Sequence, residues 1–89
     1  MAAITVNALD EVTFEVTVVD RTTTTHVVTV QPGYAAKLTE GRIPVTRLVE
    51  LSFEFLLERE SNTSILRRFD LPLIGNYFPE YEQAIRKLL

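Results

Sequence analysis

Apolar and polar residues alternate along residues 12–18, where Val12, Phe14, Val16 and Val18 are separated by threonine and glutamate. This period of two residues is typical of a β-strand that buries one face. The alternation returns over residues 24–31, and the segment between the two runs contains no glycine. The pattern therefore predicts two antiparallel strands joined by a loop of several residues, because a tight two-residue turn depends on glycine or asparagine.

Residues 1–10 offer a weaker pattern, with Ile4, Val6 and Leu9 as the large apolar side chains after Met1. We expect a loosely ordered N-terminal arm that can add a third strand to the hairpin. Residues 11–89 are expected to form a single α+β domain, because a chain of 89 residues holds one modest core.

The longest predicted helix spans residues 44–60, PVTRLVELSFEFLLERE. At about 100° per residue, its large apolar side chains cover about two thirds of the helix circumference, more than the stripe of an ordinary surface helix. They are Val45, Leu48, Val49, Leu51, Phe53, Phe55, Leu56 and Leu57. A narrow polar strip of Glu50, Glu54 and Glu58 remains for water. This helix must therefore be covered on at least two sides, by the C-terminal part of the chain or by a second copy.

Glycine and proline divide the remaining chain into short segments. A short helix is predicted over residues 34–38 and a helical turn over residues 65–69. Residues 70–78 form an apolar and aromatic connector that is too interrupted by proline for regular structure, and Pro79 suits the first turn of a last helix. The expected fold is α+β, with the antiparallel hairpin packed on the central helix and short C-terminal helices on the helix's other side.

Composition narrows the function classes. The chain has no cysteine, which excludes disulfides, thiol nucleophiles and thiolate metal sites and suits the reducing cytoplasm. Its net charge of -3 argues against broad nucleic-acid binding, because such surfaces are basic. The N-terminus lacks the pattern of a signal peptide, and no window has the ~18 to 20 apolar residues of a membrane span. We therefore expect a cytoplasmic protein with no cofactor and no membrane partner.

His26 is the only histidine and shares a strand face with Val28 and Val30. As a general base it would need an orienting carboxylate and a nucleophile, for which Asp20 and the threonines of residues 22–25 are candidates. A lone histidine on an apolar strand face more often has a structural role, bonded to backbone or hydroxyl groups. We favour the structural interpretation and keep a small enzyme that uses His26 as an alternative.

The aromatic connector is the most suggestive candidate surface. Its large side chains, together with two aromatic residues that flank it, are Phe69, Leu71, Leu73, Ile74, Tyr77, Phe78 and Tyr81. One interpretation is that they cover the exposed side of the long helix and complete the core. The other is that they form a patch for a protein partner, since tyrosine and phenylalanine are enriched at interface cores.

The segment ELSFEFLLERESNTSILRRFDLPLIGNYFPEYE, residues 50–82, resembles a family of short uncharacterised bacterial proteins. This resemblance implies a small α+β protein and assigns no activity to any residue. A second similarity is to the ribbon-helix-helix DNA-binding proteins, whose strand, helix, turn and helix match the order HVVTV, PGYAAKLTE and the long helix. Here the first helix is short, a second strand precedes the ribbon, and Val27 and Thr29 have no arginine or lysine beside them.

The hypothesis that follows is a non-enzymatic protein-protein interaction module that associates with itself or with another protein. A ribbon-helix-helix-like dimeric DNA-binding regulator is the first alternative, although the charge balance does not favour a nucleic-acid partner. The enzyme that uses His26 is the second.

Overall fold

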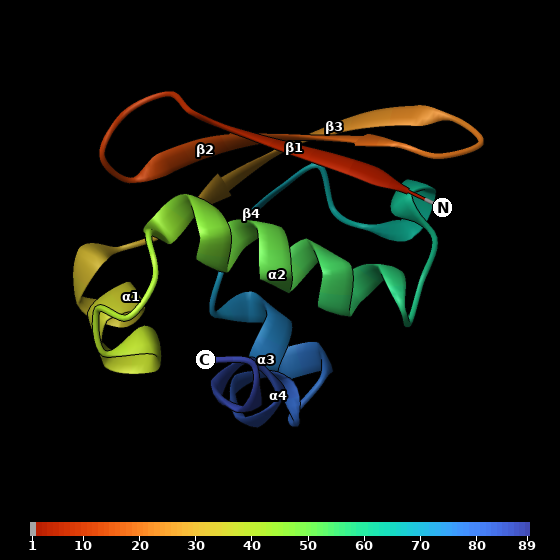
Figure 1. Cartoon of the computed structure of the whole chain (residues 1–89). Coiled ribbons are helices and arrows are strands. Elements are labelled where there is room, and N and C mark those ends of the chain that lie inside the picture. Colours follow the sequence, from red (N-terminus) through yellow and green to blue (C-terminus); the bar gives the residue numbers. More distant parts are fainter. Residues whose placement is uncertain (1) are drawn as a thin grey trace.

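Val16, Val18 and Val28 are fully buried on one face of a four-stranded sheet, as their alternation predicts. The computed structural model describes residues 2–89. In it the strands lie in the order β1 (Ala3–Ala8), β2 (Thr13–Val19), β3 (Thr23–Thr29) and β4 (Arg68–Asp70). The opposite face carries polar rows such as Thr5, Thr17 and Thr25, which are neighbours across three strands. Helices therefore cover one face of the sheet, and the other faces solvent (Figure 1).

The sheet is mixed, which corrects the expectation of a purely antiparallel hairpin. β2 pairs with β3 in antiparallel register, with Phe14 opposite Val28, and this part of the prediction is confirmed. β4 pairs in parallel with β3, with Phe69 beside Val28. The expected helical turn over residues 65–69 is wrong for the same reason: Phe69 alternates in burial with exposed Arg68 and Asp70 and so points into the core from a strand.

The N-terminal segment adds the third strand to the hairpin that the sequence allowed for. Ala3–Ala8 forms β1 and pairs with β2 along its whole length, while Met1 lies outside the described residues. Ile4 and Val6 are the large side chains of β1 that pack against the core, which explains why the apolar pattern in the sequence is weak. Asp10 stabilises the following loop, because its Oδ1 atom accepts hydrogen bonds from the backbone N–H groups of Val12 and Thr13. These backbone bonds lower the pKa of Asp10.

The helical segments follow one another between and after the strands. They are α1 (Pro32–Thr39), α2 (Val45–Leu57), the 3-10 turn η1 (Asn62–Ser64), α3 (Leu73–Tyr77) and α4 (Tyr81–Lys87). The sheet, α2, and the pair α3 and α4 form successive layers, with α1 at one end (Figure 1). The helix α3 lies inside the connector that was expected to lack regular structure. Pro72 starts it without strain, since proline needs no backbone hydrogen bond at a helix start.

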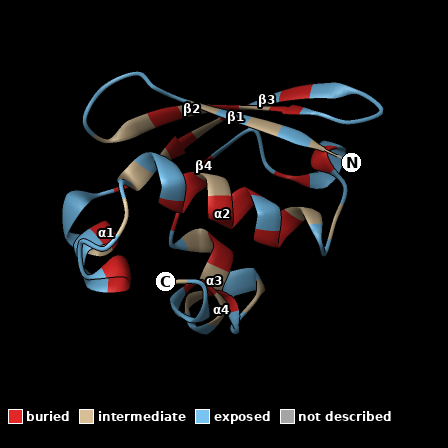
Figure 2. Ribbon diagram, viewed as in Figure 1, coloured by how far each residue is buried: buried red, intermediate tan, exposed pale blue. Residues whose placement is uncertain are grey.

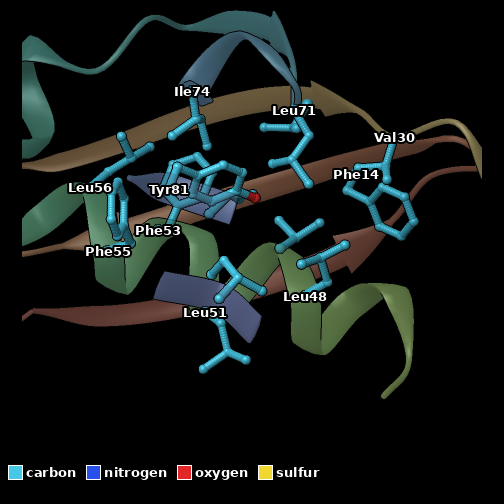
Figure 3. Close-up of a cluster of buried hydrophobic side chains, with 14 of the residues drawn as sticks. Phe14, Val30, Leu48, Leu51, Phe53, Phe55, Leu56, Leu71, Ile74 and Tyr81 are labelled. Atoms are coloured by element: carbon cyan, nitrogen blue, oxygen red, sulfur yellow. The ribbon is translucent and has the colours of Figure 1, made fainter. Parts of the chain in front are cut away.

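The helix α2 is buried between the sheet and the C-terminal helices (Figure 2). On the sheet side, the ring of Phe53 packs against His26 and Phe69, with ring centroids 5.3 and 6.1 Å apart. On the other side, Phe55 meets Phe78 and Tyr81 edge to face. Figure 3 shows the rings of Phe53, Phe55 and Tyr81 together in this cluster. The C-terminal part of the chain therefore provides the second cover that the sequence requires.

The end of α1 has an unusual backbone. Glu40 closes the helix in the left-handed region, with φ 56 and ψ 28, and its N–H bonds to the carbonyl of Ala36. Gly41 follows with a φ of 72. Two consecutive left-handed residues turn the chain sharply toward α2, and glycine occupies the second of these positions.

Candidate functional site

An apolar groove of about 280 Å³ opens beside β4. Its walls come from the C-terminal end of α2, the residues between η1 and β4, and α3. The large side chains that line it are Leu56, Ile65, Leu66, Phe69, Leu73, Ile74, Tyr77 and Phe78. Ser64 and the half-buried Glu60 are the polar residues of this lining. A lining with one carboxylate and eight large apolar side chains suits an apolar segment rather than a charged metabolite.

The floor and the rim of the groove differ in exposure. Ile65, Ile74 and Phe69 are buried and belong to the core as well as to the groove. At the rim, Leu66 is 49% exposed and Tyr77 is 67% exposed. Large apolar side chains this exposed, placed beside an apolar depression, are typical of a protein-binding surface. The rim is therefore the part of the groove that a partner would reach first.

The structure divides the predicted connector surface into buried and accessible members. Leu71 and Tyr81 are fully buried and do not line the groove, and Ile74 and Phe69 are buried at its floor. The other three residues of the set, Leu73, Phe78 and Tyr77, line the groove, the first two half-buried and Tyr77 exposed. Much of the connector thus completes the core, and Tyr77 is its most accessible large side chain.

The groove also includes residues that the sequence interpretation did not select. Leu56 comes from α2, Glu60 follows that helix, and Ile65 and Leu66 come from the segment expected to be a helical turn. The sequence does contain one indication that Leu66 is exposed, because this leucine comes directly before two arginines. In an extended segment, such as the residues that lead into β4, successive side chains point to opposite sides. Ile65 and Leu66 therefore do not both enter the core.

Arg59 fixes the position of α4 relative to α2 close to the groove. Its guanidinium carbon lies 3.6 Å above the ring of Phe55, and its Nε donates to Glu80 at 3.2 Å. The carboxylate of Glu80 also accepts a hydrogen bond from its own backbone N–H, and both bonds lower its pKa. Phe78, one of the groove residues, packs edge to face on the same Phe55 ring. The end of α2 is therefore linked to the residues between α3 and α4 by contacts outside the groove.

His26, the candidate polar residue, lies in a buried chain of hydrogen bonds. Asn62 donates from Nδ2 to the carbonyl of Thr22 and to the hydroxyl of Thr24, both at 3.0 Å. The Thr24 hydroxyl lies 2.9 Å from Nε2 of His26, and Nδ1 of His26 lies 2.8 Å from the carbonyl oxygen of Leu66. Both ring nitrogens are thus occupied, and the side chain has no exposed surface. This arrangement supports a structural role for His26.

The remaining polar groups of the described residues include side chains of the types that bind metal ions and pairs that hydrogen-bond to one another. Within residues 2–89, no three histidine, aspartate or glutamate side chains come together in a geometry that could hold a metal ion. Tyr34 bonds to Glu82 at 2.9 Å, and burial raises the pKa of Tyr34 far above its ordinary value. None of the helices over these same residues is both long enough and apolar enough to span a bilayer.

Comparison with known proteins adds no relative. No protein-family model, no curated protein and no solved structure matches the chain.

Proposed function

We propose that this chain is a protein-protein interaction module without catalytic activity, and that the apolar groove beside β4 is its binding surface. The observation that carries the proposal is the exposure of Tyr77 and Leu66 at the rim of a groove lined by apolar side chains. Burying such side chains on association removes apolar surface from water and so favours a complex, and interface cores are rich in tyrosine.

The packing of α2 supports the groove as the binding surface. The apolar arc of α2 is already covered by the sheet on one side and by α3 and α4 on the other. The apolar surface that remains therefore lies at the edges of these layers. At the groove, two exposed apolar residues and a depression occur together.

The two alternatives gain no support from the described residues. A ribbon-helix-helix dimer needs a strand that pairs with a second chain, whereas β3, the expected ribbon strand, lies between β2 and β4 of its own chain. An enzyme built on His26 needs a ring that reaches substrate, whereas this ring is buried with both nitrogens bonded.

Site-directed photo-crosslinking in the cells that produce the protein tests the proposal. Tyr77 is replaced by benzoyl-phenylalanine, which keeps an aromatic side chain at the rim of the groove. The matched control carries the same residue in place of Leu9, which is 52% exposed in the loop between β1 and β2. The proposal predicts a discrete adduct at position 77 that is absent at position 9, identified by mass spectrometry.

Either of two results would contradict the proposal: no adduct at position 77, or the same adducts at both positions. A further substitution, Leu66→Ser, strengthens the test because it removes the second exposed apolar side chain of the rim. We expect it to reduce the yield of the adduct at position 77, while Leu9→Ser leaves the yield unchanged.

A further inference from the structure

β4 is the last strand of the sheet, and one of its edges carries backbone groups that point away from β3. The N–H of Val27 bonds to the carbonyl of Arg67 at 2.7 Å, and the N–H of Leu71 bonds to the carbonyl of Thr29 at 2.9 Å. Alternate residues of a strand direct their backbone groups to opposite neighbours. The N–H and C=O groups of Arg68 and Asp70 therefore point to the outer edge, where no further strand lies among residues 2–89.

The sequence of β4 is complementary to itself in one antiparallel register. If Phe69 lies opposite Phe69 of a second copy, Arg68 lies opposite Asp70 of that copy, and Asp70 lies opposite its Arg68. Both charged side chains are exposed on the outer face of the sheet, where opposite charges across strands attract. Two-fold symmetry repeats the pair, so one register forms two ion pairs.

The same register satisfies the backbone. In an antiparallel pair, residues that exchange both hydrogen bonds alternate with residues that exchange none. Each Arg68 and Asp70 pair would exchange both bonds, which occupies every outward N–H and C=O group of these residues. Phe69 would then face its counterpart across the closer, non-hydrogen-bonded position. Charge and backbone geometry therefore select the same register independently.

This pairing also brings the two grooves together. Phe69 points to the helical face of the sheet in each copy, so the two-fold axis is perpendicular to the sheet and both helical layers lie on the same side. Each groove includes Phe69 and lies beside β4, and the exposed Leu66 and Tyr77 lie at its rim. A strand of three residues is too short to hold a dimer alone. The apolar side chains at the rims of the two grooves would add to the contact area of the strands.

The opposite edge of the sheet lacks these features. The outward side chains of β1 include Ala3, Thr5 and Asn7, which carry no charge that could set a register. The depression nearest to β1 is lined by Val6, Thr46, Arg47 and Glu50, so it offers little apolar surface. Arg47 there forms ion pairs with Glu50 and Glu54 of its own helix.

We propose that the partner of the groove is a second copy of this chain, bound by antiparallel pairing of β4 with β4 about a two-fold axis. The sheet would continue through the dimer, with Tyr77 and Leu66 of each copy closing on the groove of the other. This inference rests on the proposed function and names its partner.

Charge reversal on β4 tests the register. The variants Arg68→Asp and Asp70→Arg each replace two attractive pairs by two repulsive ones, and sedimentation equilibrium should show at least about tenfold weaker self-association for each. The double variant, with both substitutions in one chain, restores opposite charges in the two-fold register and should associate as the natural chain does. An equimolar mixture of the two single variants should form a heterodimer for the same reason.

Both residues are exposed, so the variants should fold, and far-UV circular dichroism checks this. A natural chain that stays monomeric up to about millimolar concentration would overturn the inference, since even weak specific pairs associate there. Single variants that associate normally would also overturn it, as would a double variant that does not recover. An adduct at position 77 with a different protein, from a chain that is monomeric, would remove the second copy as partner and leave the proposed function standing.

Discussion

The Nδ1 atom of His26 donates its hydrogen to the carbonyl oxygen of Leu66, 2.8 Å away. Because a carbonyl oxygen can only accept, this contact fixes the tautomer of the neutral ring, and Nε2 must then accept from the hydroxyl of Thr24. The Thr24 hydroxyl in turn accepts from Asn62. The hydrogen bonds therefore run in one direction, and they tie β3 to η1 and to Leu66 after it.

The stability of the fold should fall as the pH drops below about 6.5. Burial lowers the pKa of His26 from its ordinary value of 6.5 and outweighs the hydrogen bond to Leu66, while the charge of Arg67 lowers it further. Below pH 6.5 the unfolded chain binds a proton that the folded chain does not. The free energy of unfolding is therefore greatest above this pH and decreases toward the folded pKa, by at most ~1.4 kcal/mol per pH unit.

Urea unfolding between about pH 7.5 and 5 measures this effect, above the range where carboxylates titrate. The variant His26→Gln should be less stable, and its stability should be nearly independent of pH over the same range. An equal slope in the natural chain and the variant would show that another group is responsible.

Asn62→Ala should destabilise the fold by ~1–3 kcal/mol, because it removes the donor to the buried hydroxyl of Thr24 and one of two donors to the carbonyl of Thr22. The matched control is Thr63→Ala at the adjacent exposed position, where we expect a change within ~0.5 kcal/mol. Equilibrium unfolding in urea compares the two. Similar values for both variants would mean that the Asn62 side chain does not hold η1 against the hairpin.

Tyr81→Phe should cost ~1 kcal/mol of unfolding free energy. The hydroxyl of Ser52 donates to the carbonyl of Leu48 at 2.7 Å, so the hydroxyl of Tyr81, 2.6 Å away, donates to Ser52. Removing it deletes one buried hydrogen bond and keeps the ring. Tyr81→Ala should cost ~3–5 kcal/mol, since it also leaves a cavity against Phe55.

The control for this pair is Tyr77→Phe, which changes the same hydroxyl on an exposed ring and should leave stability within ~0.5 kcal/mol. Thermal unfolding followed by near-UV circular dichroism compares the variants. A loss at position 77 as large as that at position 81 would contradict the assignment of Tyr81 to the core.

Glu40→Gly should stabilise the fold by up to ~1 kcal/mol, because glycine adopts the left-handed conformation of Glu40 without steric cost. The exposed ion pair between Glu40 and Arg42 contributes little and offsets little of the gain. The expected rise in the midpoint of thermal unfolding is ~4–8 °C for a chain of this size.

The complementary variant Gly41→Ala should lower the midpoint. No atom lies within 4 Å of the added methyl group, so the loss would come from the positive φ of 72 alone. A midpoint unchanged by both variants would mean that the end of α1 relaxes out of this conformation.

The sequence was informative where neighbouring residues decide the structure. The alternation of Phe14, Val16 and Val18 identified β2, and the wide apolar arc of the long helix required cover on two sides. The helix ends at Leu57 rather than at residue 60, and the backbone N–H groups of Arg59 and Glu60 both bond to the carbonyl of Leu56. The residue at which a helix ends is determined by the hydrogen bonds of its last turn, and the apolar pattern of the sequence does not show these bonds.

β4 and the groove could not be predicted in the same way. β4 has three residues, too few for an alternation, and its partner β3 lies about forty residues earlier in the chain. Whether Leu71 enters the core while Tyr77 stays exposed depends on the direction in which α3 leaves β4. That direction is set by tertiary packing, and no local residue pattern encodes it.

The parallel pairing of β3 with β4 also sets an order of assembly. β4 can pair with β3 only after the chain between the two strands has folded back across the sheet. Ordering so long a segment costs conformational entropy, and the few contacts of β4 offset this cost only once the pairing has formed. The hairpin and α2 can therefore form before the edge at Arg68 exists. Until β4 docks, the backbone groups of β3 that pair with it are unpaired, so β4 also closes an edge through which unfinished chains could join.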